Sequence, residues 1–250
     1  IMGTSSCHMV LSKKLRLFDG YAGVVKDGII QGFYGYESGQ SAVGDVFAWF
    51  TKDFLGVPFA QLSKKARALE PGQSGLVALD WLNGARSVLM NGLLSGMIGG
   101  LTLHSKPEEG DRALIEGTAF GTRIIVDSYR SNGVPVTELA VCGGLVKDPL
   151  ILQIYADVTG LPIRVAASTQ AVALGSAIFG AMAAGAFGTF GEAISRMTRP
   201  PVATYKPRKK AVAIYDRLFK LYRRCHDLFG RGNVDIMTQL KEFKVGAQGD

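Results

Sequence analysis

Two short runs of glycine and hydroxyl residues have the composition of phosphate-binding loops. Gly143 and Gly144 lie between an apolar, strand-like segment and a helix-like one. A glycine pair in this setting lets a ligand lie against the backbone, and the next helix N-terminus offers free N–H groups to an anion. Gly3, Thr4 and Ser5 lie in a turn, where two hydroxyls could donate to phosphate oxygens. Each run alone is more typical of a plain turn, and neither is a Walker A loop or a dinucleotide fingerprint.

Glu37 is the acidic residue whose surroundings best suit a sugar. It lies in the run Tyr-Glu-Ser-Gly-Gln at 36–40, which is rich in hydrogen-bonding groups and is expected to form a loop. A carboxylate there, together with the amide of Gln40, could hold sugar hydroxyls, although local evidence alone favours a solvated surface acid. His8, His104 and His226 are scattered without metal-ligand spacing, which argues against a metal site and against a Ser-His-Asp triad.

The composition indicates a soluble globular protein. The 250 residues are 47% hydrophobic, enough to bury one large core or two modest ones. Three cysteines at wide spacing, with no C-x-x-C pair, argue against a disulfide framework and a structural zinc site. Unpaired cysteines are typical of a protein from the reducing cytoplasm. Residues 165–191 carry no charge, but small and polar residues interrupt them, so we expect a buried strand and helix rather than a membrane span.

The positive charge is concentrated near the C-terminus. Residues 196–231 hold eleven Lys and Arg against two Asp, a local balance of +9 (11 − 2), while the whole chain carries +7. Such a run could attract nucleic acid, and a non-catalytic nucleic-acid-binding module is therefore an alternative function. A solvated helix face is favoured, because no stacking or groove-reading motif accompanies the charge.

Hydrophobic periodicity and turn signals predict alternating strands and helices. A β-rich start is followed by helices, the first with Ser41 available as its N-cap, and later by two strand–turn–helix units. That order predicts an α/β layer with ligand chemistry at the carboxyl ends of the strands. Strands are expected at 2–12, 21–36, 75–79, 137–142 and 163–166, and helices at 41–54, 61–70, 107–131, 149–159, 169–186 and 208–229.

Three motifs in a fixed order resemble the FGGY carbohydrate kinases. Residues 96–101, followed after seven residues by 109–116, are similar to the family's second signature and depart from it at Gly110, where an apolar residue is usual. Residues 143–149 resemble the adenosine-binding segment, and residues 2–5 the second phosphate loop. Within the family, residues 32–45 and 112–123 are most similar to L-ribulokinases.

The resemblance implies a fold and a division of the chain. We expect an α/β, ribonuclease-H-like domain of the actin and hexokinase ATPase type, with a mixed sheet and flanking helices. Residues 1–199 would form the C-terminal nucleotide-binding domain, with the basic helix and tail of residues 200–250 packed on it. The chain starts at Ile1 rather than Met, so the expected N-terminal sugar and base domain would lie in a longer protein.

The resemblance also implies an activity: transfer of a phosphoryl group from Mg-ATP to a terminal hydroxyl of a ketopentose, with L-ribulose ranked first by similarity. Xylulose, D-ribulose and polyols are the alternative substrates. No catalytic base and no metal ligand are expected in this chain, which alone would bind without turnover, and a homodimer is left open. Sugar contacts are assigned to Glu37 and Gln40, and ATP contacts to Gly3, Thr4, Ser5, Gly44, Gly143, Gly144 and Asp148, where many relatives carry Asn.

Overall fold

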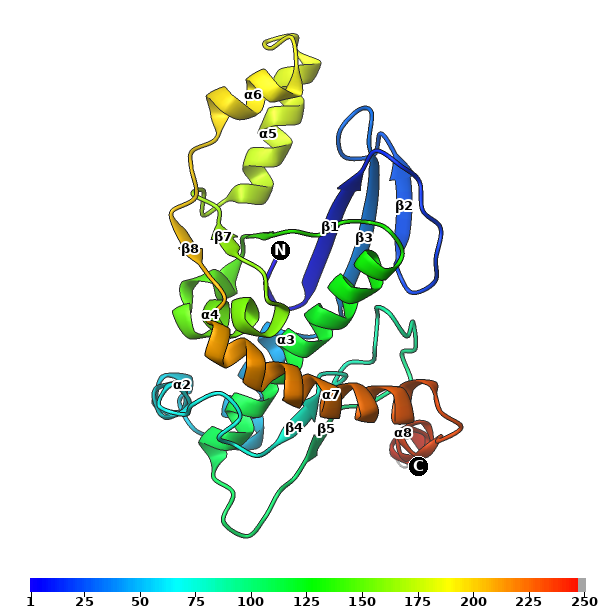
Figure 1. Cartoon of the computed structure of the whole chain (residues 1–250), viewed down its shortest axis with the longest axis vertical. Helices are drawn as coiled ribbons and strands as arrows, with labels where there is room; N and C mark the ends of the chain where they lie inside the picture. The colour runs from blue at the N-terminus through cyan, green and yellow to red at the C-terminus, as the bar shows by residue number, and fades with distance from the viewer. Residues whose placement is uncertain (247–250) are drawn as a thin grey trace.

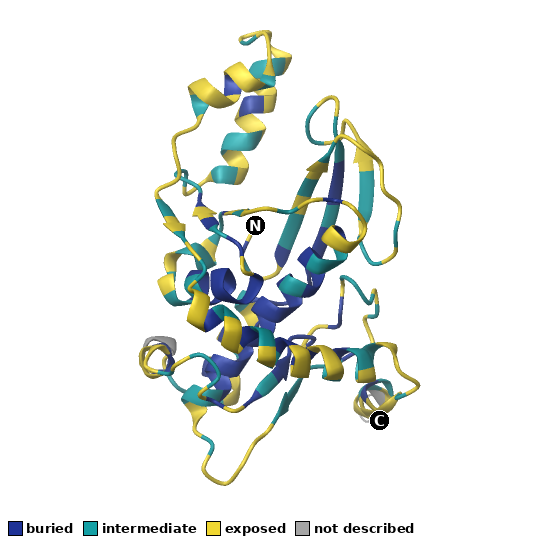
Figure 2. Cartoon of the chain, in the orientation of Figure 1, coloured by how far each residue is buried: buried dark blue, intermediate teal, exposed yellow. Residues whose placement is uncertain are grey.

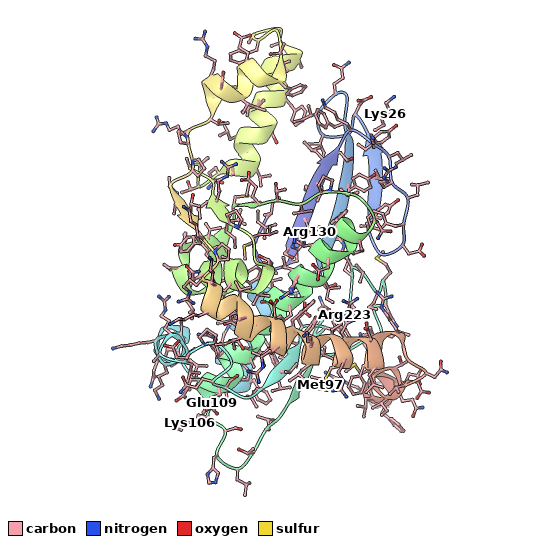
Figure 3. All side chains as sticks on the ribbon, viewed as in Figure 1. Lys26, Met97, Lys106, Glu109, Arg130 and Arg223 are labelled. Atoms are coloured by element: carbon pink, nitrogen blue, oxygen red, sulfur yellow. The ribbon has the colours of Figure 1, made fainter. Side chains whose placement is uncertain are left out.

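A long helix, α3 (Pro107–Ser131), runs through the middle of the molecule (Figure 1). The computed structural model describes residues 1–246. Pro107 begins the helix as expected, and the Glu109 carboxylate accepts a hydrogen bond from the Lys106 N–H at 2.9 Å, which caps the first turn (Figure 3). Most of the helix from Gly110 onward is buried (Figure 2). It is therefore the element against which the others pack.

Two glycines let α3 lie directly on strand β4 (Val77–Leu79). A Cβ at Gly117 would stand 2.6 Å from the Ala78 carbonyl oxygen, and one at Gly121 would stand 2.5 Å from the Asp80 carboxylate. Because these positions are four apart, they lie on the same face of the helix. The close approach brings Asp80, at the end of β4, into the centre of the fold. Strand β5 (Met97–Gly99) completes an antiparallel hairpin with β4.

The N-terminal strands form an antiparallel sheet with the order β1-β3-β2. Its strands are β1 (Ser6–Ser12), β2 (Gly23–Lys26) and β3 (Tyr34–Gln40). The pairing places Ser6 opposite Gln40 and Met9 opposite Glu37. Residues 36–40 were expected to be a loop, and this expectation is wrong. They continue the strand because Tyr36, Ser38 and Gln40 are buried against the core, which a solvated loop would not allow.

A second sheet is mixed, as expected. Strands β6 (Leu139–Val141) and β7 (Ile163–Val165) are parallel, and β8 (Ala203–Tyr205) pairs antiparallel with β7. The connection from β6 to β7 is a short 3-10 turn, η2 (Gly144–Lys147), and helix α4 (Pro149–Thr159). Gly160 ends α4 in the left-handed conformation, with φ at 66°. The first predicted strand–turn–helix unit is thus built as the sequence indicated.

The remaining helices surround these sheets. Helix α1 (Gly44–Ala48) continues into a π-helical turn, η1 (Trp49–Phe54), and α2 (Phe59–Arg67) follows. The N-cap of α1 is Val43, without a side-chain hydrogen bond, so the expected cap at Ser41 is not formed. Helix α7 (Lys209–Arg231) lies across α3 and α4 and buries Tyr215, Phe219 and Tyr222 (Figure 1). A short helix, α8 (Ile236–Gly246), ends the described chain.

The charge-free run of residues 165–191 differs from its prediction. A helix is present, α5 (Ala171–Ala183), but Ile178 is its one buried residue among those described. It packs against α6 (Phe190–Met197), with the rings of Phe179 and Phe190 5.2 Å apart, and the pair projects from the rest of the molecule (Figure 1). Within residues 1–246 there is no helix with the length and apolarity that a membrane crossing requires.

Candidate nucleotide and sugar site

The turn at Gly143 packs against Met2, the first residue of the predicted phosphate loop. The Met2 N–H donates to the Cys142 carbonyl at 2.7 Å, and the Leu145 N–H donates to the Met2 carbonyl at 3.2 Å. Gly143 has φ at +112°, and a Cβ there would overlap the backbone of Met2. Glycine is therefore required at this position, both for its dihedral angle and for the close approach of the two segments.

The other side of the loop rests on the start of α1. The Gly44 N–H donates to the Gly3 carbonyl at 3.0 Å, and the Val43 N–H donates to the Thr4 carbonyl at 2.8 Å. A Cβ at Gly44 would stand 2.7 Å from the Gly3 oxygen. The structure thus gathers three segments that are far apart in the sequence, around residues 3–5, 44 and 143–144, into one small region.

This region offers donors and bare backbone to a ligand. Thr4 and Ser5 are exposed. Gly144 is exposed as well, and a Cβ there would meet no atom within 4 Å, in contrast to the crowded Gly143 beside it. Hydroxyls, a loop backbone and an open glycine surface are the groups that bind phosphate oxygens in other proteins. The arrangement fits an extended polyphosphate lying along residues 3–5 and 144.

Asp148 is the N-cap of α4. Its Oδ1 accepts from the Leu150 N–H at 2.9 Å and from Nη2 of Arg67, on α2, at 2.8 Å. An acid before a proline at the first helical position is a helix-start signal, so this role was readable from the sequence. The carboxylate is 14% exposed, and these contacts place it between two helices close to the glycine turn. A direct contact with a nucleotide therefore stays a prediction.

Glu37 lies on β3, along the same strand pair as the phosphate loop. It is three residues before Gln40, which pairs with Ser6, so the strand rise puts it about 10 Å from that end of the sheet. Its Oε1 accepts from Nη2 of Arg86 at 2.9 Å. The Cys7 thiol lies 3.8 Å from the same oxygen, and burial, followed by the charge of Glu37, raises the pKa of that thiol. The Glu37 side chain is 41% exposed and can meet a ligand.

Gln40 is placed differently from Glu37. Its Nε2 donates to Asp80 Oδ2 at 2.7 Å and to the Thr118 carbonyl at 2.8 Å. Its Oε1 accepts from the hydroxyls of Ser6, at 3.0 Å, and Thr122, at 2.8 Å. An amide has two N–H groups and two lone pairs, so its hydrogen-bonding capacity is used within the protein. At 4% exposure, Gln40 supports the site from behind and does not present its amide to a ligand in this conformation.

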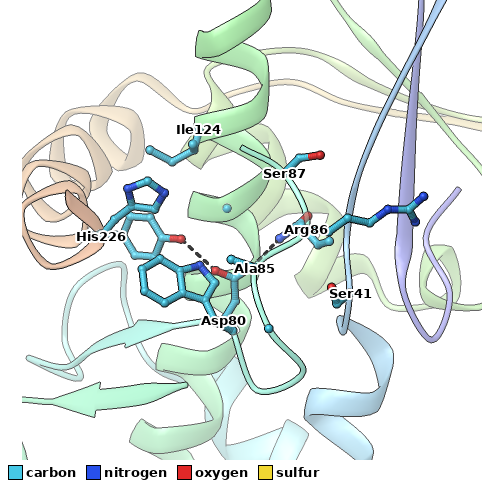
Figure 4. Close-up of a pocket in the computed structure, with 12 residues that line it drawn as sticks. Ser41, Asp80, Ala85, Arg86, Ser87, Ile124 and His226 are labelled. Carbon is cyan, nitrogen blue, oxygen red and sulfur yellow. Dashed lines mark hydrogen bonds between the residues drawn. The ribbon is translucent and has the colours of Figure 1, made fainter. Parts of the chain in front are cut away.

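Asp80 is the centre of the buried polar network behind the site (Figure 4). Asp80 Oδ1, the oxygen that does not contact Gln40, accepts from the Tyr222 hydroxyl, on α7, at 2.8 Å. Burial raises the pKa of the Asp80 carboxyl. Gly121 leaves room for the Asp80–Gln40 contact. Asp80 and Tyr222 were not predicted from the sequence, because their contact joins residues 142 apart. The signal available was an acid at the end of an apolar strand.

Comparison with known proteins decides the family. Residues 1–184 match the FGGY family of carbohydrate kinases, C-terminal domain. The chain belongs to the FGGY family. The ribulokinase of Halalkalibacterium halodurans is 50% identical to it over 260 aligned positions, which cover 97% of the chain and 46% of that protein. The ribulokinase of Geobacillus thermodenitrificans is 48% identical, and the alignment covers 99% of the chain and 47% of that protein. The chain thus spans about half the length of the curated relatives it matches.

Solved structures agree on the fold of this FGGY domain. A xylulose kinase from Rhodospirillum rubrum superposes with a TM-score of 0.79, covers 90% of the chain and 45% of its own, and is 21% identical. A glycerol kinase from Plasmodium falciparum, solved with ADP, superposes with a TM-score of 0.74 and is 21% identical. The superposition covers 89% of the chain and 46% of the glycerol kinase. The predicted family and fold class, an α/β domain of the FGGY kinases, are confirmed.

Proposed function

We propose that this FGGY domain is the nucleotide-binding half of an ATP-dependent kinase that phosphorylates a terminal hydroxyl of a ketopentose, L-ribulose first among them. The observation that carries the proposal is the meeting of Gly3, Gly44 and Gly143 at one exposed loop, since this is an arrangement suited to a polyphosphate. The ribulokinases that match nearly the whole chain favour L-ribulose over xylulose, D-ribulose or a polyol.

In this proposal the chain positions the nucleotide and one wall of the sugar site. Thr4 and Ser5 donate hydrogen bonds to phosphate oxygens, and Gly144 lets the nucleotide approach the backbone. Glu37 accepts a hydrogen bond from a sugar hydroxyl, while Gln40 holds the end of its strand in place. Phosphoryl transfer depends mostly on such positioning and on charge stabilisation. ATP supplies the phosphoryl group, and the general base is proposed to lie outside this chain.

Magnesium is part of the proposal. The described residues contain no group of three or more His, Cys, Asp or Glu that could hold a metal ion. Mg²⁺ commonly binds through substrate phosphates with one or two carboxylates. We therefore propose that residues 3–5 hold the phosphates that carry the ion. We further propose that the enzyme acts in the cytoplasm on a free sugar.

The decisive experiment is a coupled ADP-release assay on the longer protein that contains this chain. L-ribulose, D-xylulose, D-ribulose and glycerol are compared at equal concentration, with Mg-ATP. We expect the highest kcat/KM with L-ribulose. Preference for another substrate in the panel would reassign the sugar but keep the kinase, whereas ATP-dependent turnover with none of them would reject the proposal. The chain alone is expected to bind ADP, measured by calorimetry, without turnover.

A further inference from the structure

Arg86 is the side chain that holds the Glu37 carboxylate. It comes from the segment after β4, 49 residues away in the sequence, and its Nη2 donates to Glu37 Oε1 at 2.9 Å. Figure 4 shows the Arg86 side chain pointing away from Asp80 and His226 and toward the N-terminal strands. We propose that Arg86 is a positioning residue, which orients Glu37 so that its carboxylate can bind a sugar hydroxyl. The inference rests on the proposed function of Glu37.

The Arg86 side chain lies against Gly39 on its way to Glu37. A Cβ at Gly39 would stand 3.4 Å from Nη1 of Arg86 and 3.6 Å from its Cδ. The arginine stem therefore passes close over the bare backbone of β3, two residues beyond Glu37 on the same strand. A side chain at position 39 would also stand 2.6 Å from the Ser6 carbonyl oxygen. The close approach of β1 therefore requires glycine at position 39, and the Arg86 side chain packs against the same bare backbone.

The backbone beside Arg86 is fixed to the same strand. The Ser87 N–H donates to the Gly39 carbonyl at 3.1 Å, and the Gly39 N–H donates to the Ser87 hydroxyl at 3.1 Å. Ala85 and Asn91 exchange backbone hydrogen bonds of 2.9 and 2.8 Å, which close the loop that carries Arg86. The backbone on both sides of Arg86 is therefore anchored, and from this position its guanidinium reaches Glu37. A planar guanidinium orients a carboxylate better than a flexible ammonium would.

The ion pair contributes little to folding, and this makes the proposal testable. The side chains of Arg86 and Glu37 are 43% and 41% exposed. Exposed pairs of this kind stabilise proteins by about 0–1 kcal/mol. Loss of Arg86 should therefore leave the melting temperature almost unchanged while it frees Glu37 to rotate. Arg164 and Glu138 form a matched control pair on the other sheet, with 46% and 41% exposure.

The test compares Arg86→Ala, Arg86→Lys and Arg164→Ala in the longer protein that contains this chain. For Arg86→Ala we expect the sugar KM to rise about tenfold, with the ATP KM and the melting temperature unchanged, and partial recovery in Arg86→Lys. Arg164→Ala should match the wild type. Adding Arg86→Ala to Glu37→Gln should cause no further rise, since the residue it positions is already altered. A full additional rise in the double variant, or an unchanged sugar KM in Arg86→Ala, would overturn the proposal.

A second measurement separates this inference from the proposed function. A crystal structure of the Arg86→Ala variant should show the Glu37 side chain in a new rotamer or in several. An unchanged, single Glu37 conformation would reject the positioning role, whatever the activity of the enzyme. Absence of kinase activity in the wild-type protein would instead reject the proposed function and leave this structural readout decisive for Arg86.

Discussion

The Gly44 N–H and the Gly3 carbonyl lie 3.0 Å apart, and a Cβ on Gly44 would stand 2.7 Å from that same oxygen. One short contact therefore joins the start of α1 to the loop that we propose holds the phosphates. The bond fixes the direction of the loop backbone, and the missing side chain makes the bond possible. Substitutions at Gly44 should therefore affect ligand binding more strongly than they affect the packing of the core.

We expect Gly44→Ala to weaken nucleotide binding. Cβ atoms do not approach backbone oxygens to 2.7 Å, so the Gly3 carbonyl has to move and to carry Thr4 with it. A tenfold loss of ADP affinity, about 1.4 kcal/mol, is the expected size of the effect. Titration calorimetry of the chain with ADP measures it. Gly180→Ala is the control, because a Cβ there would meet no atom within 4 Å. Equal affinity in both variants would contradict the prediction.

Gly144→Leu tests the opposite situation, a glycine with open space above it. No atom lies within 4 Å of a Cβ at this position, so the new side chain should project into solvent without strain. We expect the free energy of unfolding to stay within about 0.5 kcal/mol of the wild type, as for most surface substitutions. ADP affinity should fall at least tenfold, because the leucine occupies the surface proposed for the nucleotide. Unchanged affinity would move the nucleotide away from Gly144.

The sequence was most informative where short-range rules decide the structure. Gly143, Gly160 and Pro107 lie at the turn and helix boundaries that their residue types predict, because a positive φ or a missing N–H restricts the local choices. The order of the family motifs then identified the fold. These signals depend on residues close together in the chain, and one sequence contains them in full.

Burial and side-chain pairing were harder to predict, because they depend on residues far apart in the sequence. Gln40 was expected at the ligand, but Asp80 and Thr118 bind its amide in the core. The apolar composition of α5 suggested a buried helix, but composition does not show which other element, if any, packs over an apolar helix. The pairing of Arg86 with Glu37 likewise needed the loop after β4 to fold back on β3. Tertiary packing overrides local preference at each of these points.

Tyr222→Phe is expected to destabilise the fold by about 1–3 kcal/mol, because it leaves an oxygen of Asp80 without its donor in the core. Tyr222 and Asp80 are 0% and 5% exposed, so water does not readily replace the hydroxyl. Urea unfolding of the chain measures the loss. Tyr34→Phe is the control, since no hydrogen bond of that hydroxyl to residues 1–246 is found. A loss no larger than the control's would mean that Asp80 finds another donor.

Arg208 should be more important for stability than its basic neighbours. Its side chain donates to Asp157 Oδ2 through Nε and Nη2, at 3.0 and 2.7 Å, and Asp157 is fully buried. Arg208→Ala should therefore cost about 1–2 kcal/mol, a value reduced for the partial exposure of the arginine. Lys210→Ala, at an exposed position, should be close to neutral in the same unfolding assay. Equal effects would show that the ion pair does not stabilise the fold.

The Arg208–Asp157 contact also affects the choice of variant for testing the nucleic-acid-binding alternative. Neutralising Arg208 would disturb the packing of α7, so Lys209→Gln with Lys210→Gln is the cleaner variant. We expect no salt-dependent binding of a generic DNA duplex by the wild-type chain at low salt. Binding that weakens steeply with salt and is lost in the double variant would instead favour the alternative.

Asp111 should make the stability of the chain depend on pH. It is 0% exposed, and neither carboxylate oxygen has a hydrogen-bond partner within the described structure. Burial, with a smaller contribution from the charge of Asp148, raises its pKa from 3.8 to about 6. Between these values the folded chain binds more protons at this site than the unfolded chain, so its contribution to stability falls as the pH rises from about 4 to 6 and is constant above. The expected loss is about 3 kcal/mol, at 1.36 kcal/mol for each pKa unit.

Asp111→Asn removes the ionisation and keeps the shape of the side chain. Between pH 4 and 6 its free energy of unfolding should therefore rise relative to that of the wild type, and it should remain higher at pH 7. Urea unfolding at pH 4, 5, 6 and 7 measures the difference between the two proteins. Asp53→Asn, an exposed acid, is the control and should follow the wild-type curve. If the stability of Asp111→Asn instead stays parallel to that of the wild type from pH 4 to 7, the buried Asp111 carboxyl is not the group that titrates.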